Sequence, residues 1–273
     1  MRHRRILKLL SLSVLVLTSL GFNCDREDAL QWSLVWQDEF DGPEGQSPNP
    51  QKWRFDIGTD WGNRQLEYDT DRPENVSLDG NGRLRIIARE EAYEGSAYTS
   101  GRINTRQLFA HEHGRFEAKV LLPIGQGIWP AFWMLGADFP EVPWPDCGEI
   151  DIMEYRGQEP NILVGTIHGP GHFGDAAISG RYQSSGYLNE QYHVYAIEWD
   201  GGSITWFIDA IQYHRVTRDD LPEGARWVYN HPFFMLLNVA VGGRWAGPPD
   251  ATTVFPQTML VDWVRVYAIS PRD

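Results

Sequence analysis

Apolar and polar residues alternate along much of this chain with a period of two, the spacing of a β-strand that buries one face. The clearest case is residues 115–121, Arg-Phe-Glu-Ala-Lys-Val-Leu, in which charged and apolar side chains take turns. The pattern predicts strands at residues 32–37, 83–89, 115–121, 128–135, 149–155, 163–168, 192–200, 203–209, 233–241 and 259–267. The turn sequence Asp200-Gly201-Gly202 predicts a hairpin between two of them.

The sequence contains no segment of about 12 or more residues with the spacing of an amphipathic helix. It also shows neither an internal repeat nor a low-complexity linker. The 27 Gly and 17 Pro supply the turns that many short strands need. We therefore expect an all-β fold in one domain over residues 32–270, built as a sandwich of two sheets.

The N-terminus has the composition of an export signal. Four Lys and Arg residues lie within the first eight positions, and residues 9–20 form an apolar stretch that is too short to span a bilayer comfortably. We expect residues 1–23 to be a signal peptide and residues 24–31 to be a polar tail. The protein is then secreted, and no later segment has the apolar length of a transmembrane helix.

The chain has two cysteines, Cys24 and Cys147. The residues before Cys24 resemble a bacterial lipoprotein signal imperfectly, because Gly21 and Asn23 depart from the usual residues. Cys24 is therefore either an incidental residue near the cleavage site or a lipidated first residue. In the second case the protein is a cell-envelope lipoprotein anchored through Cys24, and the membrane is a partner only then. We expect Cys147 to be a packed free thiol.

The net charge of −13 narrows the choice of partner. Binding of nucleic acid depends on Lys and Arg that neutralise phosphates, so the charge argues against a nucleic-acid partner. The same reasoning disfavours sulfated or uronic polysaccharides. A neutral ligand fits better, and the 13% aromatic content supplies flat apolar surfaces for one.

Three carboxylates lie in one short apolar run, Gly-Glu-Ile-Asp-Ile-Met-Glu at residues 148–154. In a regular strand Glu149 and Asp151 point to one face, whereas Glu154 has the opposite parity. One bulged residue near Met153 would return Glu154 to the acidic face. Three acids on one face repel each other, which suits an enzyme that needs one ionised and one protonated carboxyl.

Retaining glycoside hydrolysis uses two carboxyl groups in this way, one as nucleophile and one as acid and then base. Two other interpretations of the run remain open at this point: an exposed acidic strand, and a Ca²⁺ or Mg²⁺ site built from carboxylates. Tryptophans nearby favour a sugar ligand, since sugar rings stack on aromatic planes. Trp61 and Trp245 lie in Gly-containing loops and are candidates for the surface, whereas Trp206 and Trp263 lie in alternating strands and are expected in the core.

Residues 148–154 resemble the Glu-x-Asp-x-x-Glu signature of family 16 glycoside hydrolases, in the longer form typical of the laminarinase branch. Further segments that resemble the family are residues 35–41, 61–68, 98–103, 166–171 and 262–267. The resemblance implies a jelly-roll sandwich of two curved antiparallel sheets with a concave substrate cleft. At one point the chain departs from the family, because Arg64 and Gln65 stand where many relatives carry Asn or Glu.

The resemblance also implies roles for individual residues. Glu149 is expected to be the nucleophile, Glu154 the acid/base and Asp151 the assisting acid. The positions that match sugar contacts are Asn63, Arg102, Trp129, Trp133 and His168, to which the loop residue Trp245 is added. Two alternatives remain: Arg102 as a structural ion-pair partner, and His168 as a hydrogen-bonded strand residue.

A structural Ca²⁺ is implied as well, with no cofactor for catalysis. Asp262 interrupts the alternation of residues 259–267, on a face shared with Leu260, Val264 and Val266, and is either a hydrogen-bonded buried Asp or a calcium ligand. In the resemblance Glu39 and Gly82 complete the metal site with Asp262, although Glu39 can instead form a surface ion pair.

We therefore predict a retaining endo-β-1,3-glucanase that hydrolyses laminarin-like, neutral β-glucans, with mixed-linkage β-1,3-1,4-glucans as further substrates. The protein is expected to be a monomer. The alternatives are a transglycosylase on the same scaffold and a non-catalytic glucan-binding module. Relatives of the latter kind typically lose a catalytic Glu, and both glutamates are present here.

Overall fold

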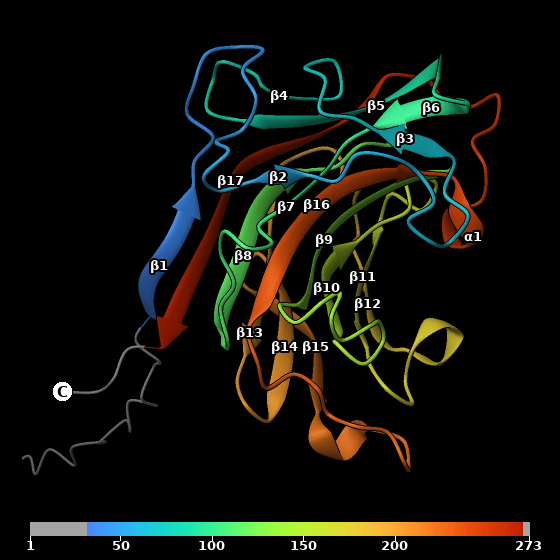
Figure 1. Ribbon diagram of the computed structural model, residues 1–273. Helices are drawn as coiled ribbons and strands as arrows, with labels where there is room; N and C mark the ends of the chain where they lie inside the picture. The colour runs from blue at the N-terminus through green and yellow to red at the C-terminus, as the bar shows by residue number, and fades with distance from the viewer. Residues whose placement is uncertain (1–31, 270–273) are drawn as a thin grey trace, which may run out of the picture. The chain divides into compact units, whose positions relative to one another are not determined.

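The structure, a computed structural model, describes residues 32–269 (Figure 1). The predicted signal peptide, the polar tail and Cys24 lie outside the described residues. Within them, two β-sheets pack face to face, joined by loops and a few short helical turns. The helical turns are η1 (Gly174–Ala176), η2 (Arg218–Asp220) and α1 (Gly243–Ala246).

The larger sheet has ten strands in the order β15-β14-β13-β8-β17-β5-β6-β3, with β1 beside β17 and β4 beside β5. Their bounds are β1 Trp32–Asp38, β3 Glu67–Asp69, β4 Val76–Leu78, β5 Leu84–Tyr93, β6 Ser96–Ser100, β8 Gly114–Leu121, β13 His193–Trp199, β14 Ser203–Ile208, β15 Ile211–Thr217 and β17 Gln257–Ile269. Neighbouring strands run antiparallel except β3 and β6, which are parallel.

The smaller sheet has seven strands in the order β12-β11-β10-β9-β16-β7-β2. Their bounds are β2 Arg54–Phe55, β7 Arg102–Asn104, β9 Ile128–Gly136, β10 Glu149–Glu154, β11 Ile162–His168, β12 Ile178–Gln183 and β16 Phe233–Val241. Neighbouring strands in this sheet pair antiparallel. The predicted all-β, two-sheet jelly roll is confirmed.

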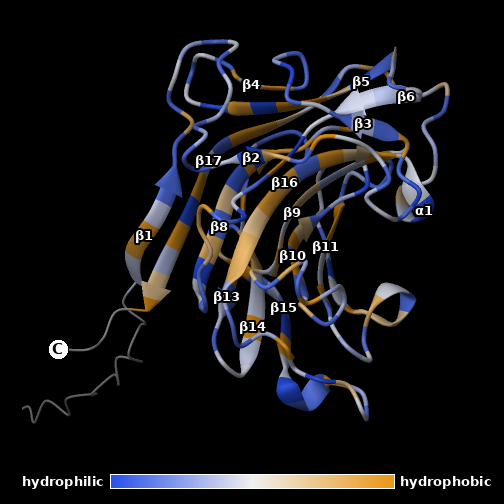
Figure 2. Cartoon of the chain, viewed as in Figure 1, coloured by the Kyte–Doolittle hydropathy of each residue, from blue (hydrophilic) through white to orange (hydrophobic). Residues whose placement is uncertain are grey.

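Apolar side chains from both sheets form one core between them. Figure 2 shows apolar colour along β16 and β9, whereas β8 alternates between polar and apolar colours. Every residue of β16 is buried, which explains why its sequence is apolar except at Asn238, because one face packs on the core and the other is covered at the cleft. Trp206 is fully buried, as predicted, and Cys147 is a buried free thiol.

The strands predicted from alternation correspond to the long strands of the structure, and β13 and β14 form the predicted hairpin. Seven strands were not predicted. Most of them, such as β3 and β7, are only two to six residues long and rich in polar residues. The edge strand β15 is longer, but its polar sequence hides its alternation.

The alternation predicted around Asp262 is wrong. A bulge between Val261 and Trp263 shifts the parity of β17, so that Val261, Val264 and Val266 share the core face. Asp262 is half-buried on the outer face, where its carboxylate lies 2.7 Å from Lys119 Nζ. Trp263 is half-buried on the outer face beside Arg265, whose guanidinium lies 4.2 Å from its ring, so its predicted place in the core is wrong.

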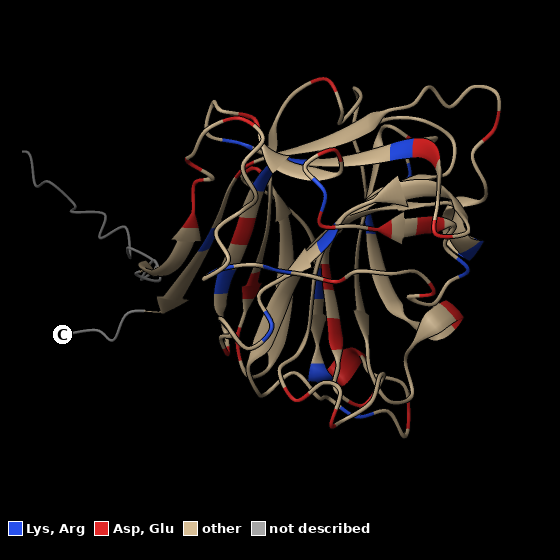
Figure 3. Ribbon diagram, turned by 45° about the horizontal axis from the view of Figure 1, so that its top comes forward, with Lys and Arg blue, Asp and Glu red and all other residues tan. Residues whose placement is uncertain are grey.

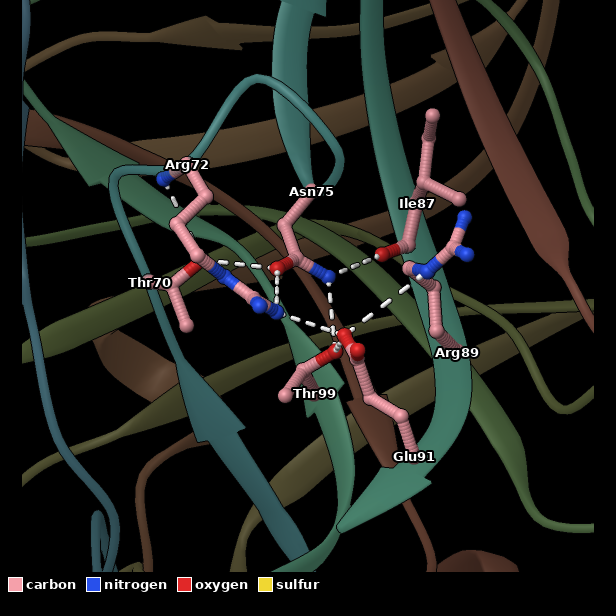
Figure 4. A network of polar contacts seen from close by, with 7 residues as sticks. All are labelled: Thr70, Arg72, Asn75, Ile87, Arg89, Glu91 and Thr99. Atoms are coloured by element: carbon pink, nitrogen blue, oxygen red, sulfur yellow. Dashed lines mark hydrogen bonds and ion pairs between the residues drawn. The ribbon is translucent and has the colours of Figure 1, made fainter. Parts of the chain in front are cut away.

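A network of polar side chains connects the loop before β4 with β5 and β6 of the larger sheet (Figure 4). Asn75, which is fully buried, donates hydrogen bonds from its side-chain nitrogen to the Ile87 carbonyl and to Thr99 Oγ1, both at 3.0 Å. Arg72 donates to Asn75 Oδ1 at 2.9 Å and to the Glu91 carboxylate, which also accepts from Thr99. The network fastens the loop before β4 to the β5–β6 hairpin.

Charged residues are spread over strands and loops, with Lys and Arg interspersed among the more numerous Asp and Glu (Figure 3). Between residues 32 and 269, none of the helices has the length and apolar character needed to cross a membrane.

Candidate active site

The three carboxylates of β10 line one cleft of about 610 Å³ that crosses the smaller sheet. Glu149 lies opposite Leu135 of β9, Asp151 opposite Trp133 and Glu154 opposite Ala131. The six residues of β10 therefore span only five positions of β9, so the acidic side chains lie on one face.

The extra residue of β10 lies between Asp151 and Met153, where the pairing register shifts. Ile150, Ile152 and Met153 are all fully buried in the core, two of them adjacent in sequence. The predicted bulge near Met153 is confirmed, and it is the local feature that brings Glu154 into the cleft.

His168, at the end of β11, faces two of these acids. The main-chain N–H of Gly174 donates to His168 Nδ1 at 3.2 Å, so the neutral ring carries its proton on Nε2. Nε2 lies 3.2 Å from Asp151 Oδ2 and 3.6 Å from Glu149 Oε1. The Nε2–H of His168 is therefore available to donate a hydrogen bond to Glu149, the predicted nucleophile, or to Asp151.

Oxygen and nitrogen atoms of Glu149, Asp151 and His168 lie within 4.8 Å of one another, close enough to be considered as metal ligands. A histidine that binds a metal through Nε2 donates its other ring N–H to an acceptor. Here Nδ1 instead accepts from Gly174, which leaves the proton on Nε2. The proton on Nε2 therefore argues against a metal site at these three residues.

Glu154 has a separate set of partners. Its Oε1 accepts a hydrogen bond from Trp129 Nε1 at 3.1 Å, and its Oε2 accepts from Thr166 Oγ1 at 3.4 Å. Thr166 in turn lies 3.0 Å from Ser179 Oγ of β12. The two glutamates thus have different partner residues, although β11 supplies one to each: His168 to Glu149 and Thr166 to Glu154.

Burial disfavours the ionised form of all three acids. Burial, followed by repulsion from Asp151, raises the pKa of Glu149 to about 8 against the opposing effect of His168. Burial likewise raises the pKa of Asp151 and of Glu154 to about 8. The cluster therefore holds protons near neutrality, so that one carboxyl can act as an acid while another is ionised.

Most of the predicted sugar-contacting residues lie in this cleft. Asn63, Arg102, Trp129, Trp133 and His168 all line it. Arg102 also forms the ion pair that was its alternative role, donating from Nε to Asp56 Oδ2 at 3.0 Å, and its contact with sugar stays a prediction. Trp245 is the exception: it packs edge-on against Trp129, with ring centroids 5.1 Å apart, and is outside the set that lines the cleft.

Several lining residues were not predicted from the sequence. Trp144 lies between two prolines in the loop before β10, with its ring 6.0 Å from that of His168 and 5.4 Å from that of Phe173. A hydrogen bond from Trp144 opposes the rise in the pKa of Glu149 that burial causes. Trp144 could have been predicted as a cleft residue, because it lies in a proline-rich loop next to the acidic strand. The other such residues include Asp56, Asn104, Phe139 and Asn238.

The residues predicted to hold calcium lie on the other sheet. The Glu39 carboxylate accepts two hydrogen bonds from Arg265, at 2.8 and 2.9 Å, and forms the surface ion pair that was the alternative. The main-chain carbonyl of Glu39, however, faces Gly82, about 3.9 Å from where a Cβ would stand. A main-chain oxygen of Glu39 and the Asp262 carboxylate are hard donors of the kind that Ca²⁺ prefers.

The family described as "Glycosyl hydrolases family 16" matches residues 56–265. A beta-glucanase of Rhodothermus marinus is 42% identical over 271 residues, covering 94% of this chain and 92% of that protein. An endo-β-1,3-glucanase structure from Pyrococcus furiosus is 43% identical with a TM-score of 0.84, covering 89% of this chain and 97% of that one. The laminarinase catalytic domain of Thermotoga petrophila is 44% identical with a TM-score of 0.83, covering 89% of this chain and all of that one.

Proposed function

The chain belongs to family 16 of the glycosyl hydrolases, and on that premise we propose that it is a retaining endo-β-1,3-glucanase acting on laminarin-like glucans. The observation that carries this proposal is the bulge of β10, which puts Glu149, Asp151 and Glu154 in one cleft beside aromatic side chains. A non-catalytic glucan-binding module would not need two glutamates held by separate sets of donors.

The reaction is a double displacement. Glu149, ionised with the help of the Nε2–H of His168 and the hydrogen bond from Trp144, attacks the anomeric carbon. Glu154 gives its proton to the leaving glycosidic oxygen. After the leaving group departs, Glu154 takes a proton from water, which then hydrolyses the glycosyl ester on Glu149. Asp151, which hydrogen-bonds Glu149, takes up part of the change in charge.

Two variants tested with azide separate the two roles. In Glu149→Ala, azide enters from the face of the missing carboxylate and an aryl β-glycoside should give the α-glycosyl azide. In Glu154→Ala, the glycosyl-enzyme still forms from a substrate with a good leaving group, and azide should then give the β-glycosyl azide. The opposite pairing of variants and products would exchange the assignments, and an α-anomer as first product of the wild type would end the retaining mechanism.

The preferred linkage is measured by comparing initial rates on laminarin, lichenan and agarose. We expect cleavage of laminarin to be fastest, lichenan to be cleaved through its β-1,3-containing segments, and agarose to be inert. Mass spectrometry of short oligosaccharide reactions reports on transglycosylation, which would give products longer than the substrate. Faster cleavage of agarose than of laminarin would contradict the proposal.

A structural Ca²⁺ is part of the proposal. The main-chain carbonyl of Glu39, Gly82 and the carboxylate of Asp262 would hold it, with Lys119 giving up its contact to Asp262. Bound there, the ion supplies stability rather than chemistry, because it lies on the sheet that does not carry the carboxylates of the cleft.

Export is a further proposal, supported by the basic and apolar segments of residues 1–23. Cell fractionation locates the protein, and metabolic labelling with a fatty acid tests whether Cys24 is lipidated. Label that persists in Cys24→Ser would refute the anchor. Size-exclusion chromatography tests the expected monomer.

A further inference from the structure

Two buried acids, separate from the three carboxylates of β10, lie behind residues that line the cleft. Glu67 and Asp69 of β3 are each 1% exposed. Burial of a carboxyl group is costly unless other groups compensate it, so each should have a specific task. Neither lines the cleft, but both adjoin residues that do.

Glu67 joins β3 to the end of β16. Its Oε2 accepts the main-chain N–H of Val241 at 2.8 Å, and the N–H of Leu66 donates to the Val241 carbonyl at 2.8 Å. The residue that follows, Gly242, has no side chain, and a Cβ there would meet Leu66 at 2.7 Å. This pairing fixes the C-terminal end of the loop that carries Trp61 and Asn63.

Asp69 holds the N-terminal side of the same loop. Its main chain exchanges hydrogen bonds with Gly58, at 2.7 and 3.0 Å. Asp69 Oδ1 and Trp61 Nε1 are buried atoms without a close, straight hydrogen bond to any group among the described residues. Burial raises the pKa of Asp69, Glu67 raises it further, and the interaction with Trp61 opposes both. The Trp61 ring also lies beside Gly58, 3.8 Å from where a Cβ would stand, and Gly58 pairs with Asp69, so the unpaired carboxyl and indole N–H belong to one buried site in which we infer that each serves the other.

The loop between these two anchors is strained. Asp60, Asn63 and Arg64 have φ values of 66°, 49° and 58°, a left-handed conformation that non-glycine residues adopt at a cost. Strain of this kind persists only where the surroundings impose it. The bonds of Glu67 and Asp69 are the ones that close the loop at its two ends.

Trp61 in turn forms one side of a stack at the cleft. The guanidinium of Arg102 lies 5.0 Å from the Trp61 ring and 4.8 Å from the Trp133 ring, and it is attracted to both buried acids. The ring of Trp61, the guanidinium and Trp133 all line the cleft. A shift of Trp61 would thus move a platform for a sugar ring without touching Glu149 or Glu154.

We propose that Glu67 and Asp69 are positioning residues that fix Trp61 and Arg102 to hold a sugar unit of the substrate away from the bond that is cleaved. The inference rests on the proposed glucanase function. It predicts a defect in binding of long substrates and an intact chemical step.

Asp69→Leu and Asp69→Asn test the inference. Leu removes the acceptor but suits a buried site, so the fold should tolerate it. We expect Asp69→Leu to raise KM for a long β-1,3-glucan about tenfold with kcat nearly unchanged, since uniform binding is lost. Asn keeps an acceptor for the indole and should restore most of the affinity. Short oligosaccharides that span only the catalytic centre should be affected by neither change.

Trp61→Phe removes the indole N–H together with one ring of the platform, and serves if Asp69→Leu does not fold. The same selective rise in KM is expected, and the double variant should be no worse than Trp61→Phe alone, because the carboxyl then has no indole N–H to hold. Glu91→Gln is the matched control: it weakens the polar network of Figure 4 and should lower the melting temperature without changing KM.

Unchanged KM in folded Asp69→Leu or in Trp61→Phe would overturn the inference while leaving the glucanase function intact. A parallel fall in kcat on long and short substrates would do the same, since it indicates general damage. A wild type without activity on any β-glucan would instead refute the function itself.

Discussion

The indole Nε1 of Trp129 donates a hydrogen bond to Oε1 of Glu154 at 3.1 Å. These residues belong to adjacent strands, β9 and β10, and the bond joins the aromatic floor of the cleft to the proposed acid/base. Burial raises the pKa of Glu154 to about 8, and this hydrogen bond opposes the rise because it favours the ionised form.

Trp129→Phe should therefore move the alkaline limb of the kcat/KM profile to higher pH. Without the N–H the ionised form loses a partner, the pKa of Glu154 rises, and the acid stays protonated over a wider range. The expected shift is about 0.5–1 pH unit. Trp245→Phe, which alters a ring packed on Trp129 with no bond to Glu154, should leave the limb in place. A limb that moves to lower pH would contradict the assignment of Glu154 as the acid.

Deletion of Met153 should remove the bulge yet keep the acids together. Six residues of β10 span five positions of β9, so a strand shortened by one residue still places Glu154 opposite Ala131. We expect activity on laminarin at least about tenfold above that of Glu154→Gln, which loses the proton donor. Stability should fall by about 2–5 kcal/mol, because a buried side chain is lost. A folded deletion variant no more active than Glu154→Gln would show that the bulge does more than correct parity.

Asp151→Asn should stabilise the fold, and more so as the pH rises. Burial raises the pKa of Asp151 from 3.8 to about 8, so between these values the folded state keeps a proton that the unfolded state has lost. The free energy of unfolding therefore falls with rising pH in this window, and Asn removes that loss. Thermal melts should show that Asp151→Asn raises the melting temperature more at pH 8 than at pH 4.5. Each kcal/mol of added stability corresponds to a rise of about 2–4 °C.

The control for this prediction is Asp250→Asn. The hydrogen bond from the Thr252 side chain lowers the pKa of the exposed Asp250, so its ionised form is favoured in the folded state. Its replacement should be slightly destabilising above pH 4. A gain from Asp151→Asn that shrinks as the pH rises would refute the burial argument.

Removal of calcium should lower the melting temperature without changing kcat at a temperature where the fold persists. A ligand that binds only the folded state contributes about 2.7 kcal/mol when present at 100 times its Kd. Asp262→Asn should abolish the difference between Ca²⁺ and EDTA. Glu39→Gln should retain it, because the Glu39 carboxylate pairs with Arg265 and only its main chain faces Gly82. Equal melting temperatures of the wild type in Ca²⁺ and EDTA would exclude the site.

The sequence predicts the acidic face of β10 because a regular strand would turn the Glu154 carboxyl into the apolar core. Burial of that carboxyl costs more free energy than a bulge that returns it to the acidic face. The bulge at Asp262 in β17 has no such signal. A single half-buried Asp can lie on either face, so parity alone assigns Asp262 to the core face, whereas the bulge puts it on the outer face.

Short strands such as β3 and β7 are set by their neighbours rather than by their own sequence. Glu67 and Asp69 are polar residues that the sequence favours on the surface, and their burial depends on Val241 and Trp61, which are brought there by the fold. Trp144 and Phe173 meet for the same reason, since they come from loops on either side of β10 and β11. Such contacts follow from the tertiary structure and leave no local pattern.

The strand nearest the C-terminus, β17, occupies an inner position of the larger sheet. It pairs with β8 on one side, and on the other with β5 along Gln257–Val261 and with β1 along Val264–Ile269. The first described strand, β1, therefore has no partner in the sheet until β17 has been synthesised, more than 200 residues later. Closure of this layer is a late folding event that joins distant parts of the chain, and contacts of such high sequence separation slow folding.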